Sequence, residues 1–387
     1  MSIDDFEPQI APVIEAVDLD ATVRFFADVL GFRIETVSPA DSPVDIAMGG
    51  FGGRVVIRRS DRDVATPLIV TCQAPALIAR SPFRAPNGTT VEFRGGTSDP
   101  SVPEGRPSLS IVRATDGSTV ETGRAGMIYR DVLPDRWGGR FIASHIGTPS
   151  GGDVPDWVHF HRIRFQMIFC AAGWVEVVYE DQGPPFRLEA GDCVLQPPEI
   201  RHRVLRSSPG LEVIEVGCPA VHDTLADHDL ELPTADVSPA RDFGGQRFVR
   251  HIAADAPMRP WFQPGTVFRD TGIGRATGGL AGATVVAADD GNPPDGAMPL
   301  THAGEFVFDV VLDGSAELHL ADDSGAVVEP LCRMDAVAIP PGVEWHWSNM
   351  SDDCEFLEVA LPSDAVGYAR RRASAAGRRS SGEPIEL

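Results

Sequence analysis

The residues whose types and spacing could do chemistry lie close together in the middle of the chain. His159 and His161 are two positions apart, so on a β-strand both imidazoles project from the same face. Gln166 is an odd number of positions from both, so it can join them only where the chain bends or bulges, around residues 162–164. His202 follows a Pro-Pro corner and could return on a neighbouring strand. Three imidazoles and one amide oxygen converging in this way would bind a divalent transition metal.

This stretch resembles the two signature motifs of the cupin superfamily. The first motif pairs His-x-His with an acidic residue five positions on and a Gly seven further, and the second runs Gly, five residues, Pro-x-Gly, two residues, His. The residues that fall in register with both motifs are His159, His161, Gly173, Gly191, Pro197 and His202. Two positions depart from the family pattern, because Gln166 replaces the usual Glu and Glu199 replaces the usual turn Gly. The resemblance implies that the metal ligands are His159, His161, Gln166 and His202.

Composition bounds the class of protein. A chain of 387 residues is long enough for two or three domains, and 39 Gly with 33 Pro indicate many turns and a β-rich architecture. The formal net charge of −23 argues against a nucleic-acid or anionic-membrane partner, since phosphate binding needs a basic face. All 33 basic residues are arginine, which excludes Schiff-base chemistry on lysine, covalent pyridoxal phosphate and a P-loop.

Cysteine usage and the lack of apolar runs indicate a cytoplasmic protein. The six cysteines are scattered without a Cys-x-x-Cys pair, and most lie in apolar runs, which is typical of reduced core thiols. The N-terminus shows no signal-peptide pattern, and no apolar run reaches membrane-spanning length. We therefore expect a cytoplasmic protein that acts on a small molecule, without a membrane partner.

Residues 1–95 form the first predicted module. Its expected elements are a strand at 10–17, a helix begun by Asp18 or Asp20 and ended by Gly31, and strands at 44–48, 54–59, 67–72 and 89–93. The segments Phe-Phe-x-x-Val-Leu-Gly-Phe and Pro-Asn-Gly-x-x-Val-Glu-Phe resemble one βαβββ module of the glyoxalase/bleomycin-resistance (vicinal oxygen chelate) family. In that family the last Glu, here Glu92, can bind metal with a His on the first strand, but no His precedes His145, so we expect Glu92 to be structural. One module is half of that family's cavity, so it needs a partner, either a second copy across a dimer or another domain, and we expect a homodimer.

The rest of the chain contains an internal repeat. We predict a linker at 96–112, a metal-binding cupin barrel at 113–219, a solvated connector with His222 and His228 at 220–262, a second and degenerate cupin barrel at 263–366, and a disordered tail at 367–387. Aligning the repeats places Leu300, His302, Val307 and Trp345 at the four ligand positions, which predicts a filled second barrel without metal. The predicted fold class is mainly β, with two jelly-roll cupin barrels after the βαβββ module.

The resemblance also suggests an activity. Quercetinase-like and diketone-cleaving bicupins imply a metal-dependent dioxygenase, an oxidoreductase acting on a small enolisable or aromatic oxygenated substrate. Fe(II) is the expected ion, although Zn, Mn, Ni and Cu also suit imidazole ligands. His145 and Glu199 are candidates for proton transfer, and we expect the arginines near the motifs to lie on the solvated outer face. The alternatives are a redox-silent zinc cyclase or isomerase and a non-catalytic small-molecule-binding protein.

Overall fold

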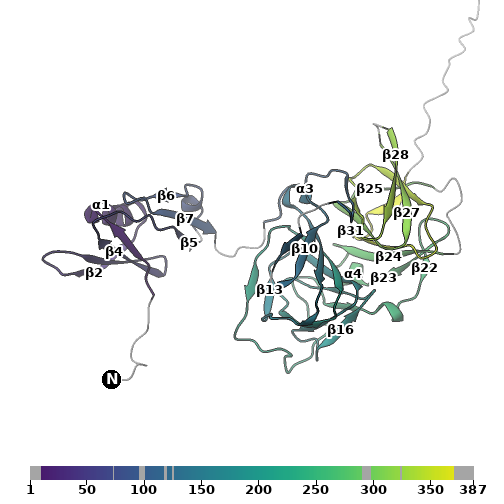
Figure 1. Cartoon of the computed structure of the whole chain (residues 1–387), viewed down its shortest axis with the longest axis horizontal. Coiled ribbons are helices and arrows are strands. Elements are labelled where there is room, and N and C mark those ends of the chain that lie inside the picture. Colours follow the sequence, from purple (N-terminus) through teal and green to yellow (C-terminus); the bar gives the residue numbers. More distant parts are fainter. Residues whose placement is uncertain are drawn as a thin grey trace, which may run out of the picture. The chain divides into compact units, whose positions relative to one another are not determined.

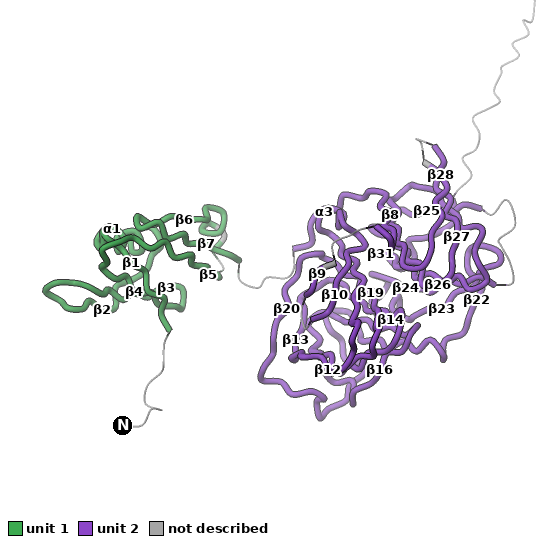
Figure 2. The backbone as a smooth tube through the Cα atoms, in the orientation of Figure 1, with its two compact units in different colours: residues 1–98 green, residues 99–387 purple. Residues whose placement is uncertain are grey.

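The computed structural model describes residues 10–72, 74–95, 101–116, 120–123, 126–289, 298–322 and 325–369. Of the expected disordered tail at 367–387, residues 370–387 lie outside the described residues, whereas Gly367 and Tyr368 belong to a short strand. The chain divides into two compact units, residues 1–98 and residues 99–387 (Figure 2). Strands make up 47% of the structure and helices 8%, so the prediction of a mainly β protein is confirmed (Figure 1).

The first unit begins with a four-stranded sheet in the order β1-β4-β3-β2, in which β1 is parallel to β4. Its elements are β1 (Val13–Ala16), α1 (Leu19–Arg24), the π-helical turn η2 (Phe25–Val29), β2 (Arg33–Ser38), β3 (Asp45–Gly50) and β4 (Gly53–Arg59). Helix α1 begins after Asp18, whose side chain accepts a hydrogen bond from the amide of Ala21 at 2.9 Å. Strand β2, which sequence analysis did not predict, is exposed along its whole length and has no alternating pattern of burial.

The remainder of the first unit is a separate three-stranded sheet in the order β5-β7-β6. Its elements are β5 (Leu68–Cys72), α2 (Pro75–Ile78), β6 (Phe83–Arg84) and β7 (Thr90–Gly95). The Pro-Asn-Gly turn is anchored by Asn87, whose amide donates to the carbonyl oxygens of Glu15 at 2.9 Å and Val64 at 3.2 Å. Glu92 forms an ion pair with Arg94 at 2.8 Å. The resemblance of this unit to a vicinal oxygen chelate module stays a prediction.

The second unit begins with a β-barrel made of two sheets. One sheet has the order β21-β17-β14-β19-β11-β10-β9, and the other has the order β16-β15-β18-β13-β20, with β12 also pairing with β18. The bounds are β9 (Val120–Thr122), β10 (Ile128–Asp131), α3 (Arg136–Gly139), β11 (Ile142–Thr148), β12 (Gly152–Asp153), β13 (His159–His161), β14 (Phe165–Ala172), β15 (Trp174–Tyr179), β16 (Phe186–Glu189), β17 (Cys193–Leu195), β18 (His202–Ser207), β19 (Leu211–Cys218), β20 (Thr224–Ala226) and β21 (Val249–His251).

A second barrel repeats this arrangement. Its sheets have the orders β22-β23-β24-β31-β26-β29-β8 and β28-β27-β30-β25-β32. The bounds are β8 (Ser110–Val112), the 3-10 turn η4 (Ala253–Asp255), β22 (Arg259–Pro260), β23 (Thr266–Asp270), α4 (Ile273–Ala276), β24 (Gly282–Ala288), β25 (Leu300–His302), β26 (Phe306–Asp313), β27 (Ser315–Asp322), β28 (Gly325–Cys332), β29 (Ala336–Ala338), β30 (Glu344–Ser348), β31 (Glu355–Leu361) and β32 (Val366–Tyr368).

Two segments expected to be irregular contribute strands instead. The expected linker contains β8, which pairs with β29 of the second barrel. The expected connector contains β20, which pairs with the histidine strand β13, and β21, which pairs with β17. Each of these strands has three residues. A strand this short shows no periodicity, because its identity depends on the partner strand rather than on its own residues.

The two barrels share a hydrophobic core. The faces of β14 and β19 that point away from the first barrel pack against the corresponding faces of β26 and β31. At the centre, the rings of Phe141 and Phe306 stack with centroids 4.1 Å apart. A second core fills the second barrel and includes Trp345, Trp347 and Phe356, all fully buried. These central strands are therefore buried on both faces, one toward a barrel interior and one toward the other barrel.

The cysteines and the helices bear on the remaining predictions. All six cysteines are free, and four of them are buried. None of the helices in the described part of the chain is long and apolar enough to cross a membrane.

Candidate metal centre

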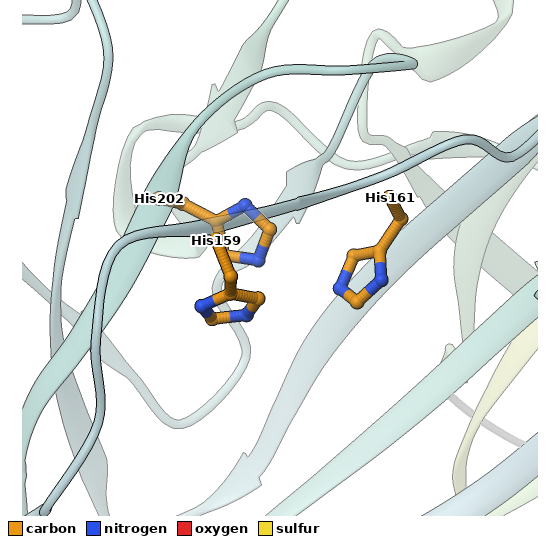
Figure 3. Close-up of side chains that lie close together, drawn as sticks. All are labelled: His159, His161 and His202. Carbon is orange, nitrogen blue, oxygen red and sulfur yellow. The ribbon is translucent and has the colours of Figure 1, made fainter. Parts of the chain in front are cut away.

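Three histidines meet inside the first barrel (Figure 3). His159 and His161 project from the same face of β13, as their spacing predicts, and His202 on β18 lies directly opposite His159 in the antiparallel register. The ring centroids of His159 and His202 are 4.2 Å apart, and His161 lies 5.3 Å from His159 and 5.4 Å from His202. One ring nitrogen of each residue lies within 4.8 Å of those of the other two, so the group could hold a metal ion.

The surroundings of the three imidazoles fix which nitrogen faces inward. In each ring Nδ1 faces a backbone carbonyl oxygen: that of Trp157 at 2.8 Å for His159, Asp223 at 3.3 Å for His161 and Ile200 at 3.0 Å for His202. A carbonyl oxygen only accepts, so Nδ1 carries the proton and Nε2 is the basic nitrogen. The three side chains are at most 8% exposed. Buried imidazoles oriented by backbone acceptors are the usual arrangement of metal-binding histidines in proteins.

A buried carboxylate lies behind this group. Asp156 is fully buried at the side chain, and its Oδ2 lies 3.6 Å from Nδ1 of His159. The same oxygen accepts a hydrogen bond from the amide of Val204 at 3.0 Å, which fixes the carboxylate between β18 and the loop before β13. Sequence analysis did not single out Asp156. Its signal was local, since an acidic residue three positions before a motif histidine can reach that histidine's outer nitrogen.

Two of the histidines, His161 and His202, line a cavity of about 350 Å³ inside the first barrel. Its walls are mostly apolar, and include Ile142, Ile146, Ile168, Val175, Val177, Leu188, Val204, Leu211 and Val213. Polar groups gather at His161 and His202, with Gln166, Gln196 and Tyr179 nearby on the lining. The hydroxyl of Tyr179 accepts a hydrogen bond from Nε2 of Gln196 at 2.8 Å. None of the described residues that line the cavity is an arginine.

Gln166 reaches the same cavity from the other sheet. Strand β13 ends at His161 and β14 begins at Phe165, so the chain changes sheets across residues 162–164, where sequence analysis allowed for a bend. The Gln166 side chain is 2% exposed and lines the cavity with His161 and His202. Its Nε2 donates a hydrogen bond of 2.6 Å to Oε1 of Glu215. Its Oε1 is buried and has no hydrogen-bond partner among the described residues.

Glu215 is the second residue that sequence analysis missed. It lies on β19, where every second residue faces the cavity, namely Leu211, Val213 and Glu215. Of the two acidic residues of this mostly apolar strand, Glu215 shares a face with Leu211 and Val213, and this was the available signal. It could not be used without knowing which face of the strand points inward.

The two residues predicted for proton transfer, His145 and Glu199, do not line the cavity. His145 lies between Ser144 and Ile146, which line the cavity, so its side chain is on the opposite face of β11. There its Nδ1 lies 3.4 Å from Nε of Arg130 and its Nε2 lies 3.9 Å from Glu212, and burial lowers the pKa of the imidazole. Glu199 occupies the turn with φ of 63°. Its exposed side chain forms an ion pair with Arg162 at 2.9 Å and does not line the cavity.

The arginines near the motifs also point away from the cavity. Arg164 donates two hydrogen bonds to Glu305 in the second barrel, at 2.8 and 3.0 Å. Arg201 pairs with Asp227 at 3.1 Å and covers the ring of Phe160. These arginines therefore tie the motif strands to neighbouring segments, and none of them is placed to meet a molecule in the cavity.

The position of His222 differs from the prediction, which placed this residue in a solvated connector. It lines the cavity, and its ring centroid lies 5.2 Å from that of His161. Its Nδ1 lies 3.1 Å from the carbonyl oxygen of Pro219. The segment after β19 thus returns over the histidine strand, where β20 pairs with β13, instead of leaving the barrel.

The second barrel carries different residues at the equivalent positions. Leu300 lies opposite Trp345 in the register that His159 and His202 occupy in the first barrel. Leu300, Trp345 and Val307 are fully buried in the core of the second barrel. The remaining ligand position is His302, whose Nε2 lies 2.7 Å from the carbonyl oxygen of Ile339.

Two antiparallel barrels with a shared core, and with the motif histidines inside the first, define a two-barrel cupin fold. Solved structures similar to this chain include variants of the oxalate decarboxylase of Bacillus subtilis. One has a TM-score of 0.51 and another 0.50, and each is 14% identical to this chain, covering 70% of this chain and 81% of that chain. A third variant has a TM-score of 0.50 at 13% identity with the same coverage. No family model matches the chain, and no curated protein matches it. At this identity the likeness concerns the fold, and it confirms the prediction of two cupin barrels.

Proposed function

We propose that this chain is a metal-dependent enzyme whose ion is held by Nε2 of three histidines, His159, His161 and His202, and by the amide oxygen of Gln166. One observation carries the proposal: three buried imidazoles with Nδ1 directed at backbone carbonyls bring their basic nitrogens close together, and two of them, His161 and His202, line the cavity. The buried Gln166 oxygen, which no described residue engages, fits a fourth ligand. Imidazole-rich ligation suits Fe(II), our expected ion, as well as Mn, Ni, Cu and Zn.

The cavity favours a mostly apolar substrate. Beyond the metal ion itself, the described lining offers a small dianion such as oxalate no cationic partner. The nearest arginines of the motif strands are paired with Glu305, Glu199 and Asp227 on the outside. A cavity of about 350 Å³ with branched aliphatic walls fits an aromatic or enolisable molecule of a ring or two. We therefore propose a dioxygenase acting on such an oxygenated substrate, and we do not carry over the activity of the oxalate decarboxylases.

The chain's own residues would orient the substrate and exclude water. The aliphatic walls would hold a ring by burial of apolar surface, and the hydrogen-bonded Tyr179–Gln196 pair would offer a polar contact beside His202. A divalent ion, when bound, would supply Lewis acidity toward an enol or phenol oxygen and, for a redox-active ion, access to O₂ chemistry. The expected homodimer, the absence of nucleic-acid and membrane partners and the cytoplasmic location stay predictions.

The test is the metal content of the purified chain and of two variants, measured by elemental mass spectrometry. We expect about one metal ion per chain in the wild type and in His346→Ala, a matched histidine variant on the second barrel, and none in His161→Ala. O₂ uptake with catechols and β-diketones then tests the oxygenase activity, and oxalate serves as the negative control. Bound zinc with no O₂ uptake would instead favour a cyclase or isomerase. Equal metal content in all three proteins would refute the site.

A further inference from the structure

The proposed ligands carry no negative charge. Three imidazoles and an amide are all neutral, so the ion's two positive charges are not compensated by any ligand. Among the described residues that line the cavity, Glu215 is the only one with a carboxylate, and none is an arginine. Glu215 therefore accepts a hydrogen bond from Gln166, and Gln166 is the one proposed ligand that departs from the cupin motif pattern.

The register of β14 and β19 explains how these two side chains meet. Gln166 pairs with Gly217, and Glu215 pairs with Ile168, so Gln166 and Glu215 are diagonal neighbours on the inward face of the sheet. Gly217 has no side chain between them. The hydrogen bond of 2.6 Å from Nε2 of Gln166 to Oε1 of Glu215 follows from this geometry.

The carboxylate also decides which way the amide points. An ionised carboxylate only accepts hydrogen bonds, so the amide must present its NH₂ group to Glu215 and turn its oxygen away. The oxygen so turned is the buried Oε1 that no described residue engages. Without Glu215, the amide could rotate and present its NH₂ group, which cannot bind a cation.

We propose that Glu215 is a positioning residue of the metal centre, which locks the Gln166 amide with its oxygen toward the three histidines and supplies the negative charge that the glutamine lacks. This inference rests on the proposed function, because it assumes that the three histidines hold a metal ion. The negative charge that the usual glutamate ligand carries is thereby retained, but it lies on Glu215, which contacts the ligand Gln166 instead of the metal ion. A carboxylate hydrogen-bonded to a ligand typically changes metal affinity by about 10- to 100-fold when it is removed.

The second barrel supports this interpretation by contrast. Glu358 occupies the register position of Glu215, as its pairing with Asp309 matches the pairing of Glu215 with Ile168. At the position of Gln166 the second barrel has Val307, so no amide is available there. Oε2 of Glu358 is buried and has no hydrogen-bond partner among the described residues. The scaffold thus carries a carboxylate at this position in both barrels, and only the barrel with the histidines gives it an amide.

The experiment measures the affinity of metal-free protein for Mn(II) and Co(II) by calorimetry, with the visible absorption spectrum of the Co(II) form as a readout of ligand arrangement. Glu215→Leu removes both the charge and the acceptor, and Glu215→Gln removes the charge alone. The exchange variant Gln166→Glu with Glu215→Gln reverses the pair. Glu176→Gln is the control, since Glu176 lies on the outer face of β15 between the cavity residues Val175 and Val177.

We expect Glu215→Leu to weaken binding about 10- to 100-fold and to alter the Co(II) spectrum. Glu215→Gln should have a smaller effect, and the exchange variant should recover affinity to within about threefold of wild type. The thermal midpoint of metal-free Glu215→Leu establishes that the variant is folded. Wild-type affinity and spectrum in Glu215→Leu, with binding abolished in His161→Ala, would overturn this inference and leave the metal site standing. Wild-type binding in His161→Ala would overturn the proposed function itself.

Discussion

Two carboxyl groups buried in the second barrel make its stability depend on pH. Asp309 on β26 and Glu358 on β31 lie opposite each other and are 1% and 6% exposed. Neither oxygen of Asp309 has a hydrogen-bond partner among the described residues. Burial, and then repulsion from Glu358, raises the pKa of Asp309 well above its ordinary value, and burial raises the pKa of Glu358. Below these raised pKa values the folded protein favours the neutral form of both carboxyls.

The direction of the effect follows from proton linkage. An unfolded chain releases these protons near pH 4, whereas the folded chain keeps them to higher pH. The folded state binds more protons in that interval. The contribution of these two carboxyls to the unfolding free energy is therefore fully present below about pH 4 and is lost as pH rises. For each proton that the folded state retains and the unfolded state has released, the unfolding free energy falls by about 1.4 kcal/mol per unit of rising pH. Between pH 5 and pH 7 one such carboxyl lowers stability by about 3 kcal/mol.

The variant Asp309→Asn keeps the shape of the side chain and removes its titration. We expect its unfolding free energy to fall less steeply with pH than that of the wild type, by about 1.4 kcal/mol per pH unit. Urea denaturation at pH 5, 6, 7 and 8 measures both slopes, with Asp153→Asn as the control because Asp153 is exposed on the outer face. Parallel slopes for wild type and Asp309→Asn would show that the carboxyl is ionised in the folded protein and would refute the reasoning.

Two further predictions concern the contact between the barrels. The hydrogen bonds from Arg164, and then from Arg140, lower the pKa of Glu305 to about 2, so its contribution is complete above the unfolded value near 4.5 and is lost as pH falls toward 2. Glu305→Gln should therefore lower the thermal midpoint at pH 6, by the equivalent of about 1 kcal/mol, but not at pH 2, and a constant difference at both pH values would contradict this. Phe306→Ala should lower the unfolding free energy by about 3–5 kcal/mol and lower the melting temperatures of both barrels together. The reason is that Phe306 stacks on Phe141 in the core that the two barrels share. Calorimetry in which only the second barrel melts earlier would show that the barrels unfold independently.

The histidine arrangement could be predicted from sequence because it depends on local periodicity. His159 and His161 share a face wherever residues 159–161 form a strand, and the motif spacing placed His202 on the strand beside them. Glu215 could not be predicted in this way. Glu215 reaches Gln166 only through the pairing of β14 with β19, which joins segments 49 positions apart in the chain. No local pattern carries that register.

The position of His145 outside the cavity could not be predicted for a different physical reason. Strand β11 is buried on both faces, since Ala143 packs in the core between the barrels and Ile146 lines the cavity. A strand buried on both sides lacks the alternation of apolar and polar residues that tells its faces apart. His145 could therefore be placed on a strand but not on a face. The short strands β8, β20 and β21 were missed because three residues define no period at all.

The comparison of the two barrels shows how few side chains separate a cavity from a packed core. His159 and His202 face each other in the first barrel at the register where Leu300 and Trp345 face each other in the second. The indole of Trp345 is fully buried among the aliphatic side chains of the second barrel, where the first barrel opens into its cavity. Because the strand order is the same, the difference lies in the side chains and not in the backbone path. Introducing histidine at 345 would therefore leave a void beside Leu300 and only two imidazoles, with Nε2 of His302 already directed at the carbonyl oxygen of Ile339, rather than a second metal site.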